Sequence, residues 1–354
     1  QEHSLMKLTI GVGDYRKIGI EETIEYIQFA EKIGIDSVWS AEAWSTDAVT
    51  CLAFIAARTS KIKLGSGVMQ VGPRAPSMIA MTALSLNALS KGRFLLGLGA
   101  SGPQVIEGLA GVPYNEPLTR LRETVEICRM AFAGEKIIYE GKHHVLPRPG
   151  GEGIALRLDF APAEIPIYLA TLGPRSLQYT GAAADGWMGT SFSPIHAGAH
   201  LDYIAQGAKD AGRELSQIDL GAAVTIGISD DVEGLIASRK PGLAFQIGAM
   251  GSADTNFYNK AFERAGYTED TKAVQALWLA GKREEAALRI PDVMINEFQA
   301  LGTAEMVRAR LMSYKQAGIT SLNLRLDIAK TMKERMALLE QIVDIVNSLP
   351  KVGH

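Results

Sequence analysis

The chain has 354 residues, of which 47% are hydrophobic and 21% are charged, and its formal net charge is -3 at pH 7. This composition is typical of a globular protein and fits either one large α/β barrel or two medium-sized domains. The small negative charge argues against a nucleic-acid-binding surface, and no apolar run reaches the length of a membrane span. We therefore expect neither nucleic acid nor membrane as a partner.

Short apolar runs alternate with amphipathic segments along most of the chain. The expected strands are residues 8–12, 36–40, 62–69, 94–98, 165–170, 186–190, 220–228 and 319–326. The expected helices are residues 21–33, 47–59, 76–90, 119–132, 174–184, 197–211, 303–317 and 332–349. Eight strands separated by helices predict one closed parallel (β/α)8 TIM barrel over residues 6–350.

Two irregular stretches and the chain start depart from this alternation. Residues 134–162 predict an excursion at the barrel rim, and residues 229–300 predict a helical insertion before the last βα unit. Residues 1–5 read as a remnant ahead of a natural start at Met6, with no signal peptide. The two cysteines lack CxxC spacing and lie in helical patterns, which favours a reducing compartment, so we expect a cytoplasmic protein.

Residues 92–108 are the most distinctive stretch of the chain. The apolar run 94–98 reads as a strand buried on both faces, and Gly97, Gly99 and Gly102 leave the backbone at its end without side-chain bulk. Bare backbone at the carboxyl end of a strand suits the close approach of a flat ring or a phosphate. An ordinary glycine-rich turn would give the same pattern.

The loops that follow the strands should build the site, because TIM-barrel sites lie at the carboxyl ends of the strands. These loops are rich in glycine and small residues and carry few titratable groups. They contain no Gly-x-Ser-x-Gly elbow, no Ser-His-Asp set and no His, Cys, Asp and Glu cluster suited to a catalytic metal. A bound cofactor is therefore expected to supply the chemistry.

Individual residues in these loops allow more than one interpretation. Glu42 could act in the site or cap the next helix, and Trp44 could stack on a ring or pack at the rim. Residues 171–175 enter a helix at its amino end, where free N–H groups and the helix dipole favour an anion. Arg74 and Arg175 lie on the same rim, although either could be a surface charge.

Several motifs together resemble a known family. They are Ser37-Val-Trp-Ser-Ala-Glu-Ala-Trp44, Leu64-Gly-Ser-Gly-Val-Met-Gln70, the stretch 92–104, the run 165–170, Leu172-Gly-Pro174, Ala184-Asp-Gly-Trp187, Asn256-Phe-Tyr258 and Gln316-Ala-Gly-Ile-Thr320. With them the chain resembles the bacterial luciferase-like flavin and deazaflavin oxidoreductases. Within these it is similar to the branch that uses coenzyme F420 and includes relatives of methylenetetrahydromethanopterin reductase. The resemblance covers essentially the whole chain.

This resemblance implies coenzyme F420 as the cofactor, with FMN as the alternative, and a small-molecule substrate. It places a non-prolyl cis peptide at Gly67–Val68, as a bulge against the deazaflavin ring, and the cofactor phosphate beside the loop after the fifth strand. The cofactor-binding residues that it implies are Glu42, Gly67, Val68, Met69, Gln70, Ala100, Ser101, Gly102, Thr171, Leu172, Gly173, Pro174 and Arg175. A homodimer is expected by the same analogy.

The chain also departs from its expected relatives. F420-dependent sugar-phosphate and alcohol dehydrogenases of this family carry Asp-His after the second strand and a glutamate after the fourth, where this chain has Glu42-Ala43 and Gly102. The absence of this histidine and this glutamate disfavours alcohol oxidation. It favours reduction of an activated C=C or C=N bond, for which the cofactor supplies the hydride. Glu42 is left as the predicted catalytic residue, a proton donor or ring anchor whose pKa is raised by burial against Trp44.

Two alternative functions and two interpretations of the insertion stay open. The chain could be an FMN-dependent monooxygenase fed by a separate reductase, or a binding protein that keeps the barrel without catalysis. Residues 229–300 contain two short apolar segments, 247–251 and 256–258, the first with glycine hinges. They predict a lid over the substrate face or a helical pair packed outside the barrel.

Overall fold

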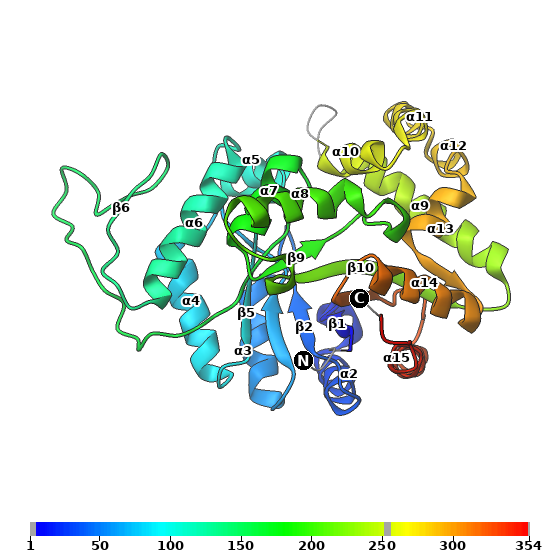
Figure 1. Cartoon of the computed structure of the whole chain (residues 1–354), viewed down its shortest axis with the longest axis horizontal. Helices are drawn as coiled ribbons and strands as arrows, with labels where there is room; N and C mark the ends of the chain where they lie inside the picture. The colour runs from blue at the N-terminus through cyan, green and yellow to red at the C-terminus, as the bar shows by residue number, and fades with distance from the viewer. Residues whose placement is uncertain (1–4, 251–255, 353–354) are drawn as a thin grey trace.

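Within the described residues, eight parallel strands close into a barrel (Figure 1). They are β1 (Lys7–Gly11), β2 (Ser37–Ser40), β3 (Lys63–Ser66), β5 (Phe94–Gly99), β8 (Ile167–Leu169), β9 (Gly186–Gly189), β10 (Asp219–Ile228) and β12 (Ser321–Arg325). Closure is made by β12, which pairs in parallel with both β1 and β10. The computed structural model describes residues 5–250 and 256–352, so most of the expected N-terminal remnant, and Gly251 of the expected hinge, lie outside the described residues.

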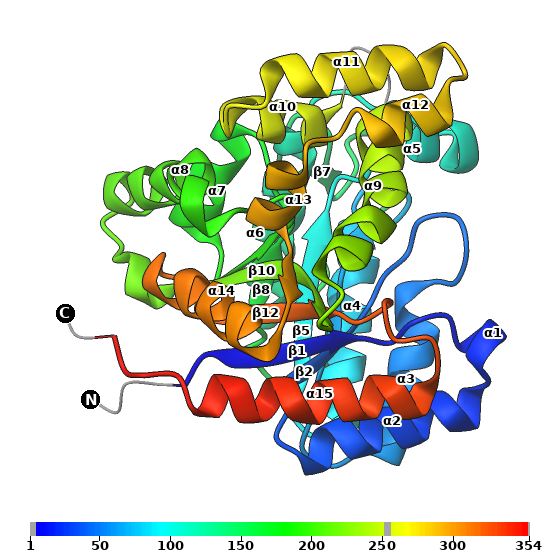
Figure 2. The same ribbon diagram turned by 90° about the vertical axis from the view of Figure 1, so that its right-hand side faces the viewer.

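Helices surround the barrel and cover the outward faces of its strands (Figures 1 and 2). They are α1 (Tyr15–Ile18), α2 (Ile20–Lys32), α3 (Ala48–Arg58), α4 (Pro76–Leu89), α6 (Pro117–Phe132), α7 (Pro174–Ala183), α8 (Gly198–Asp210), α14 (Ala304–Gln316) and α15 (Met332–Asn347). Apolar residues at helical spacing, such as Ile24 and Ile27 of α2, are fully buried. Figure 2 shows α15 beside α2, so the last helix packs next to the first long one.

The wall next to the site is less regular than the sequence predicts. The single strand expected over 62–69 is divided into β3 and the short β4 (Met69–Gln70), which pairs with the far end of β5. The cis peptide expected at Gly67–Val68 is present between the two. The loop expected after β5 contains a helix, α5 (Pro103–Ala110). Proline at its first position fits a helix start that the glycine-rich sequence concealed.

The excursion 134–162 projects away from the barrel on the left of Figure 1. It holds an antiparallel hairpin of β6 (Tyr139–Glu140) and β7 (Val145–Leu146). The carboxylate of Glu123 on α6 fixes this hairpin, since it accepts hydrogen bonds from the backbone N–H groups of Lys142 and His143. Consequently the turn of the hairpin is fastened to α6.

The insertion forms a helical layer over one side of the barrel mouth, at the top of Figure 2. It consists of α9 (Val232–Ala249), α10 (Phe257–Arg264), α11 (Thr268–Leu279), α12 (Arg283–Leu288), α13 (Asp292–Phe298) and β11 (Ala300–Gly302). Ile247, Val274 and Met294 are fully buried in an apolar core that belongs to these helices alone. The layer is joined to the barrel by β11, which pairs with the last residues of β10. None of the helices in the described part of the chain is long and apolar enough to cross a membrane.

Candidate active site

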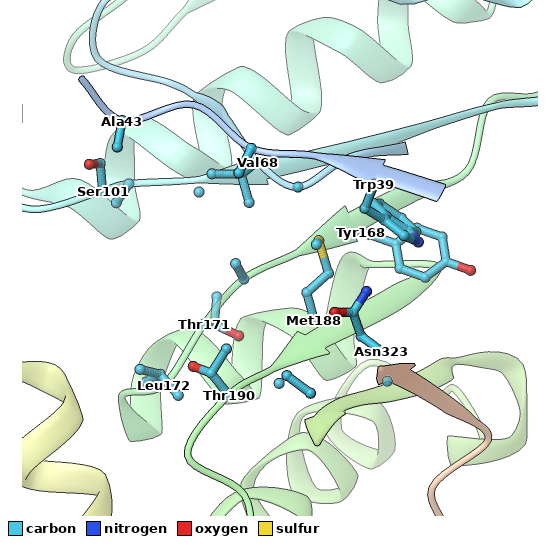
Figure 3. A pocket seen from close by; sticks show the side chains of 18 of the residues that line it. Trp39, Ala43, Val68, Ser101, Tyr168, Thr171, Leu172, Met188, Thr190 and Asn323 are labelled. Atoms are coloured by element: carbon cyan, nitrogen blue, oxygen red, sulfur yellow. The ribbon is translucent and has the colours of Figure 1, made fainter. Parts of the chain in front are cut away.

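A cavity of about 2340 Å³ opens at the carboxyl ends of the barrel strands. Figure 3 shows its two walls, with Val68 and Ser101 on one and Thr171, Met188 and Asn323 on the other. The predicted cofactor-binding residues that line it are Glu42, Gly67, Val68, Ala100, Ser101, Gly102, Thr171, Leu172, Gly173, Pro174 and Arg175. The expectation that the βα loops converge on one site is therefore met.

Met69 and Gln70 do not line the cavity, contrary to the prediction. Met69 is 0% exposed because pairing of β4 with β5 turns its side chain into the barrel core. Gln70 is also buried, and its side-chain amide donates to Ser101 Oγ at 3.1 Å and to the Glu42 backbone carbonyl at 3.3 Å. Both residues thus support the wall behind the cavity.

Glu42 is held by an ion pair and by backbone donors. Arg74 donates from Nε to Oε1 at 3.0 Å and from Nη2 to Oε2 at 2.8 Å. The backbone N–H groups of Gln70 and Ala48 donate to the same two oxygens, each at 2.9 Å. The hydrogen bonds from Arg74 to Glu42 also raise the pKa of Arg74. The carboxylate therefore ties together the segments that follow β2 and β3.

This geometry overturns the expected environment of Glu42. Trp44 is 67% exposed, so the predicted burial of the carboxyl group against Trp44 is not found. Both carboxylate oxygens are instead engaged, by two bonds from a guanidinium and two from backbone N–H groups. Glu42 is consequently placed to hold the backbone rather than to release a proton.

The amino end of α7 presents unpaired backbone donors to the cavity. Gly173 is the N-cap, and no side chain among residues 5–250 and 256–352 caps the first N–H groups of this helix. Arg175 is exposed at the same end and lines the cavity. The preceding loop is fixed because Arg264 of α10 donates to the Leu172 carbonyl at 2.6 Å. Free N–H groups, the helix dipole and a guanidinium together make a site suited to an anion.

Aromatic side chains that sequence reasoning missed form the cavity floor. Trp39 and Tyr168 meet edge to face with ring centroids 5.1 Å apart, beside Met188. The Tyr168 hydroxyl donates to Asp219 at 2.7 Å, which satisfies its polar atom below the floor. The sequence could have indicated them, because both lie on predicted barrel strands, where alternate side chains point inward.

The insertion supplies the outer side of the cavity. Phe245, Ala249 and Met250 from the end of α9, and Tyr258 from α10, line it. The layer is joined to the rim because Gln246 donates to Ser191 Oγ at 3.0 Å. The insertion thus has its own core outside the barrel, and one of its faces lines the cavity.

The cavity is poor in groups that could exchange protons. No histidine or cysteine lines it in the described ranges. Its carboxylates are engaged. Glu42 pairs with Arg74, Glu116 with Lys142 at 2.5 Å and Asp327 with Arg239 at 2.8 Å, while Asp14 pairs with Arg16, Asp219 with Lys7, and Asp210 accepts from Gln206. General acid–base catalysis therefore has few candidates among these residues.

The residues present fit a cofactor with a planar ring and an anionic tail. The volume exceeds the 300–1,000 Å³ or so that a single drug-sized ligand needs, which leaves room for a substrate beside it. Val68, Ala100 and Gly102 form a wall of small groups, and a Cβ built on Gly102 would meet nothing within 4 Å. The amino end of α7 and Arg175 suit the tail.

Comparison with known proteins agrees with this description. The family model for luciferase-like monooxygenases matches residues 3–321. A protein of Mycobacterium tuberculosis (strain ATCC 25618 / H37Rv), named as a coenzyme F420-dependent oxidoreductase, is 35% identical over 342 residues, which are 94% of this chain and 99% of the relative. The 5,10-methylenetetrahydromethanopterin reductase of Methanolobus tindarius is 29% identical over 319 residues, or 89% and 93% of the two chains.

A solved structure shares the architecture. The coenzyme F420-dependent tetrahydromethanopterin reductase from Methanopyrus kandleri superposes with a TM-score of 0.77 at 25% identity, over 96% of this chain and 98% of the other. The predictions of a luciferase-like TIM barrel and of an oxidoreductase are confirmed by these similarities. The chain belongs to the luciferase-like monooxygenase family.

Proposed function

We propose that the protein is a coenzyme F420-dependent oxidoreductase that reduces an activated C=C or C=N bond of a small organic substrate. The observation that carries this proposal is the 35% identity, over nearly the full length of both chains, to a relative named as F420-dependent. The cavity supports it, because its small-residue wall and its anion site lie within one enclosure.

Particular residues would hold the coenzyme. The backbone N–H groups at the start of α7 and the guanidinium of Arg175 would bind its anionic tail. Gly67, Val68 and the segment 100–102 would face its ring, since they bring little side-chain bulk to the wall. When bound, the coenzyme supplies or accepts the hydride.

The protein's own contribution is then to orient the substrate and exclude water. The floor of Trp39 and Tyr168 closes the barrel below the site. Phe245 and Tyr258 cover it from the insertion, which would limit the entry of water. Because the carboxylates at the mouth are ion-paired, the cavity is better suited to reducing an activated double bond than to deprotonating an alcohol.

We assign Glu42 a positioning role in this reaction. It accepts from the backbone N–H of Gln70, and the Gln70 side chain donates to Ser101 on the facing loop. These bonds link the loop after β2 to the wall that would face the ring. Glu42 therefore acts through Gln70 and Ser101 on the shape of the site.

The experiment is a fluorescence titration of the full chain with F420 and, separately, with FMN. We expect F420 to bind more tightly. Tighter binding of FMN, with oxygen consumption when reduced FMN is supplied, would instead select the monooxygenase alternative. If neither F420 nor FMN binds, the result would favour the alternative of a barrel that has no catalytic activity.

We also propose a homodimer, by analogy with the family and because apolar side chains are exposed on neighbouring helices. Phe54 of α3 is 42% exposed, and Met78 and Leu89 of α4 are 50% and 66% exposed. Light scattering after size exclusion would give the mass in solution. Phe54→Glu should shift that mass toward the monomer if this face is the interface.

A further inference from the structure

The last barrel strand ends in a polar pair that faces the cavity. Along β12, Leu322 and Leu324 are buried in the core, although Leu324 also borders the cavity, while Asn323 is half-buried and Arg325 exposed and both line it. This follows from the alternation of side chains along a strand. Arg325 is therefore carried by a barrel strand rather than by a mobile loop, which favours precise placement.

A chain of hydrogen bonds fixes one edge of the Arg325 side chain. Its Nε donates to Asn323 Oδ1 at 3.0 Å, and Asn323 Nδ2 donates to Thr9 Oγ1 at 2.9 Å. Thr9 belongs to β1, so the bonds join the two strands where the barrel closes. The two terminal amino groups of Arg325 have no hydrogen-bond acceptor in the described part of the protein. They form the free end of the guanidinium fork.

The charge of Asp327 favours the charged form of Arg325, but the two side chains form no ion pair. The nearest acid along the chain, Asp327, pairs with Arg239 at 2.8 Å, and Arg239 Nε donates to Gln299 at 3.2 Å. No ion pair to Arg325 occurs among residues 5–250 and 256–352. The side chain is exposed to solvent within the cavity, and the protein around it lowers its pKa by desolvation. The free end of the fork is therefore open to an anionic group of a ligand that enters the cavity.

We propose that Arg325 binds a carboxylate of the substrate, so that the substrate is a monocarboxylic acid with an apolar body. This inference rests on the proposed function for the reaction itself. A planar fork with two free amino groups matches a carboxylate in a bidentate pair. One uncompensated positive charge matches a monoanion better than a phosphate dianion. The apolar body would lie against Met188 and Phe245.

Arg325 is separate from the anion site assigned to the coenzyme. Figure 3 shows Asn323, its hydrogen-bond partner, well apart from Leu172 of the α7 entry loop. The α7 end already offers backbone N–H groups and Arg175 for the anionic tail. Two separate cationic sites in one cavity are what a charged coenzyme and a charged substrate require.

The test is calorimetric titration of the full chain, with and without saturating F420, using benzoate, benzamide and phenyl phosphate as probes. Benzoate and benzamide have nearly the same shape and differ in charge. We expect the wild type to bind benzoate about 10-fold more tightly than benzamide, and more tightly than phenyl phosphate. Arg325→Gln should abolish the preference, and Arg325→Lys should keep part of it because the charge remains without the fork.

The matched control is Arg122→Gln. Arg122 also lines the cavity without a carboxylate partner among the described residues, but its guanidinium lies over the Tyr179 ring, 5.3 Å from the centroid. This variant should keep the full preference for benzoate. Circular dichroism establishes that each variant is folded, and Arg325→Lys serves if the glutamine variant does not fold.

Four results would overturn the proposal: no preference for benzoate in the wild type, a preference that survives Arg325→Gln, tighter binding of phenyl phosphate, or loss of F420 affinity in Arg325→Gln. The last would make Arg325 a coenzyme-binding residue. If F420 does not bind the wild type at all, the proposed function fails. The benzoate measurement without F420 still decides the role of Arg325.

Discussion

The charged side chains on the two walls of the cavity differ in whether the protein supplies their partners. On the wall built by the segments after β2, β3 and β5, the Glu42 carboxylate has donors on both oxygens. On the wall formed by the start of α7 and the end of β12, Arg175 and Arg325 have no carboxylate partner in the described part of the chain. Removing one partner of a largely buried ion pair leaves the other charge unpaired and destabilises the fold, whereas a charge in a cavity without a protein partner is open to a ligand. The first wall is therefore expected to affect stability, and the second to affect binding.

The strongest test of the first wall is Glu42→Gln. It removes the ion pair and leaves Arg74, whose side chain is only 23% exposed, without its partner. We expect the free energy of unfolding to fall by roughly 3 kcal/mol, while turnover at saturating substrate changes only a few-fold. Urea denaturation and steady-state kinetics measure the two quantities.

A double variant controls this experiment. Arg74→Met in the Glu42→Gln background should recover part of the lost stability, because it removes the unpaired guanidinium. If Glu42→Gln unfolds like the wild type but loses most of its turnover, the two walls do not differ as described. Glu42 would then be the proton donor of the original prediction.

His200 sharpens the comparison, since it is an unpartnered polar group that lies outside the cavity. It is 1% exposed, neither ring nitrogen has a hydrogen-bond partner among the described residues, and burial lowers its pKa from 6.5 to about 4. Because the folded pKa is depressed, the unfolded chain takes up the proton first as pH falls. The contribution to stability is therefore present above pH 6.5 and is lost toward pH 4.

We expect about 2 kcal/mol of this loss between pH 6.5 and 4.5, and His200→Leu should remove it. Chemical denaturation of both proteins at several pH values gives the difference. An identical pH dependence would mean that His200 gains a partner in solution. F420 affinity should not change, since His200 contacts Trp187 and Phe192 rather than the cavity.

Arg175→Ala tests the second wall. The residue is exposed and has no ion pair in the described part of the chain, so melting temperature should stay the same. F420 affinity should fall about 10-fold, or about 1.4 kcal/mol, through loss of a charged contact to the tail. Arg148→Ala is the control, because Arg148 is exposed and lies outside the cavity. An unchanged dissociation constant for Arg175→Ala would show that this guanidinium only faces solvent.

The alternation of apolar runs and helices was enough to predict the barrel, because each strand and helix is encoded locally. It failed where long-range pairing decides the structure. The separation of β4 from β3 depends on the register with β5, which no local pattern contains. The insertion was predicted to be helical, but the bounds of its helices were not, since their apolar faces pack mainly against one another.

The candidate site was predicted in outline but not in its partners. Glu42 and Arg74 were each noticed, yet their pairing joins residues far apart in sequence and needs the strand order to be seen. Arg325 was overlooked although β12 reads Ser-Leu-Asn-Leu-Arg, where polar residues alternate with leucine. In a barrel strand that alternation already indicates polar groups directed into the mouth.

The smallest expected effect concerns Gly102. The sequence suggested that this glycine leaves bare backbone at the end of β5 for a flat ring to approach. Its φ of -128° is allowed for any residue, and an added Cβ would meet nothing within 4 Å. Gly102→Ala should therefore change stability by less than about 0.5 kcal/mol. The new methyl group would nevertheless stand in the cavity where the ring is proposed to approach, so F420 affinity should fall roughly 3-fold, about 0.7 kcal/mol. Gly108→Ala adds the same group to α5 outside the cavity and should leave affinity unchanged. If both variants bind F420 like the wild type, the glycines after β5 make a turn and no part of the ring site.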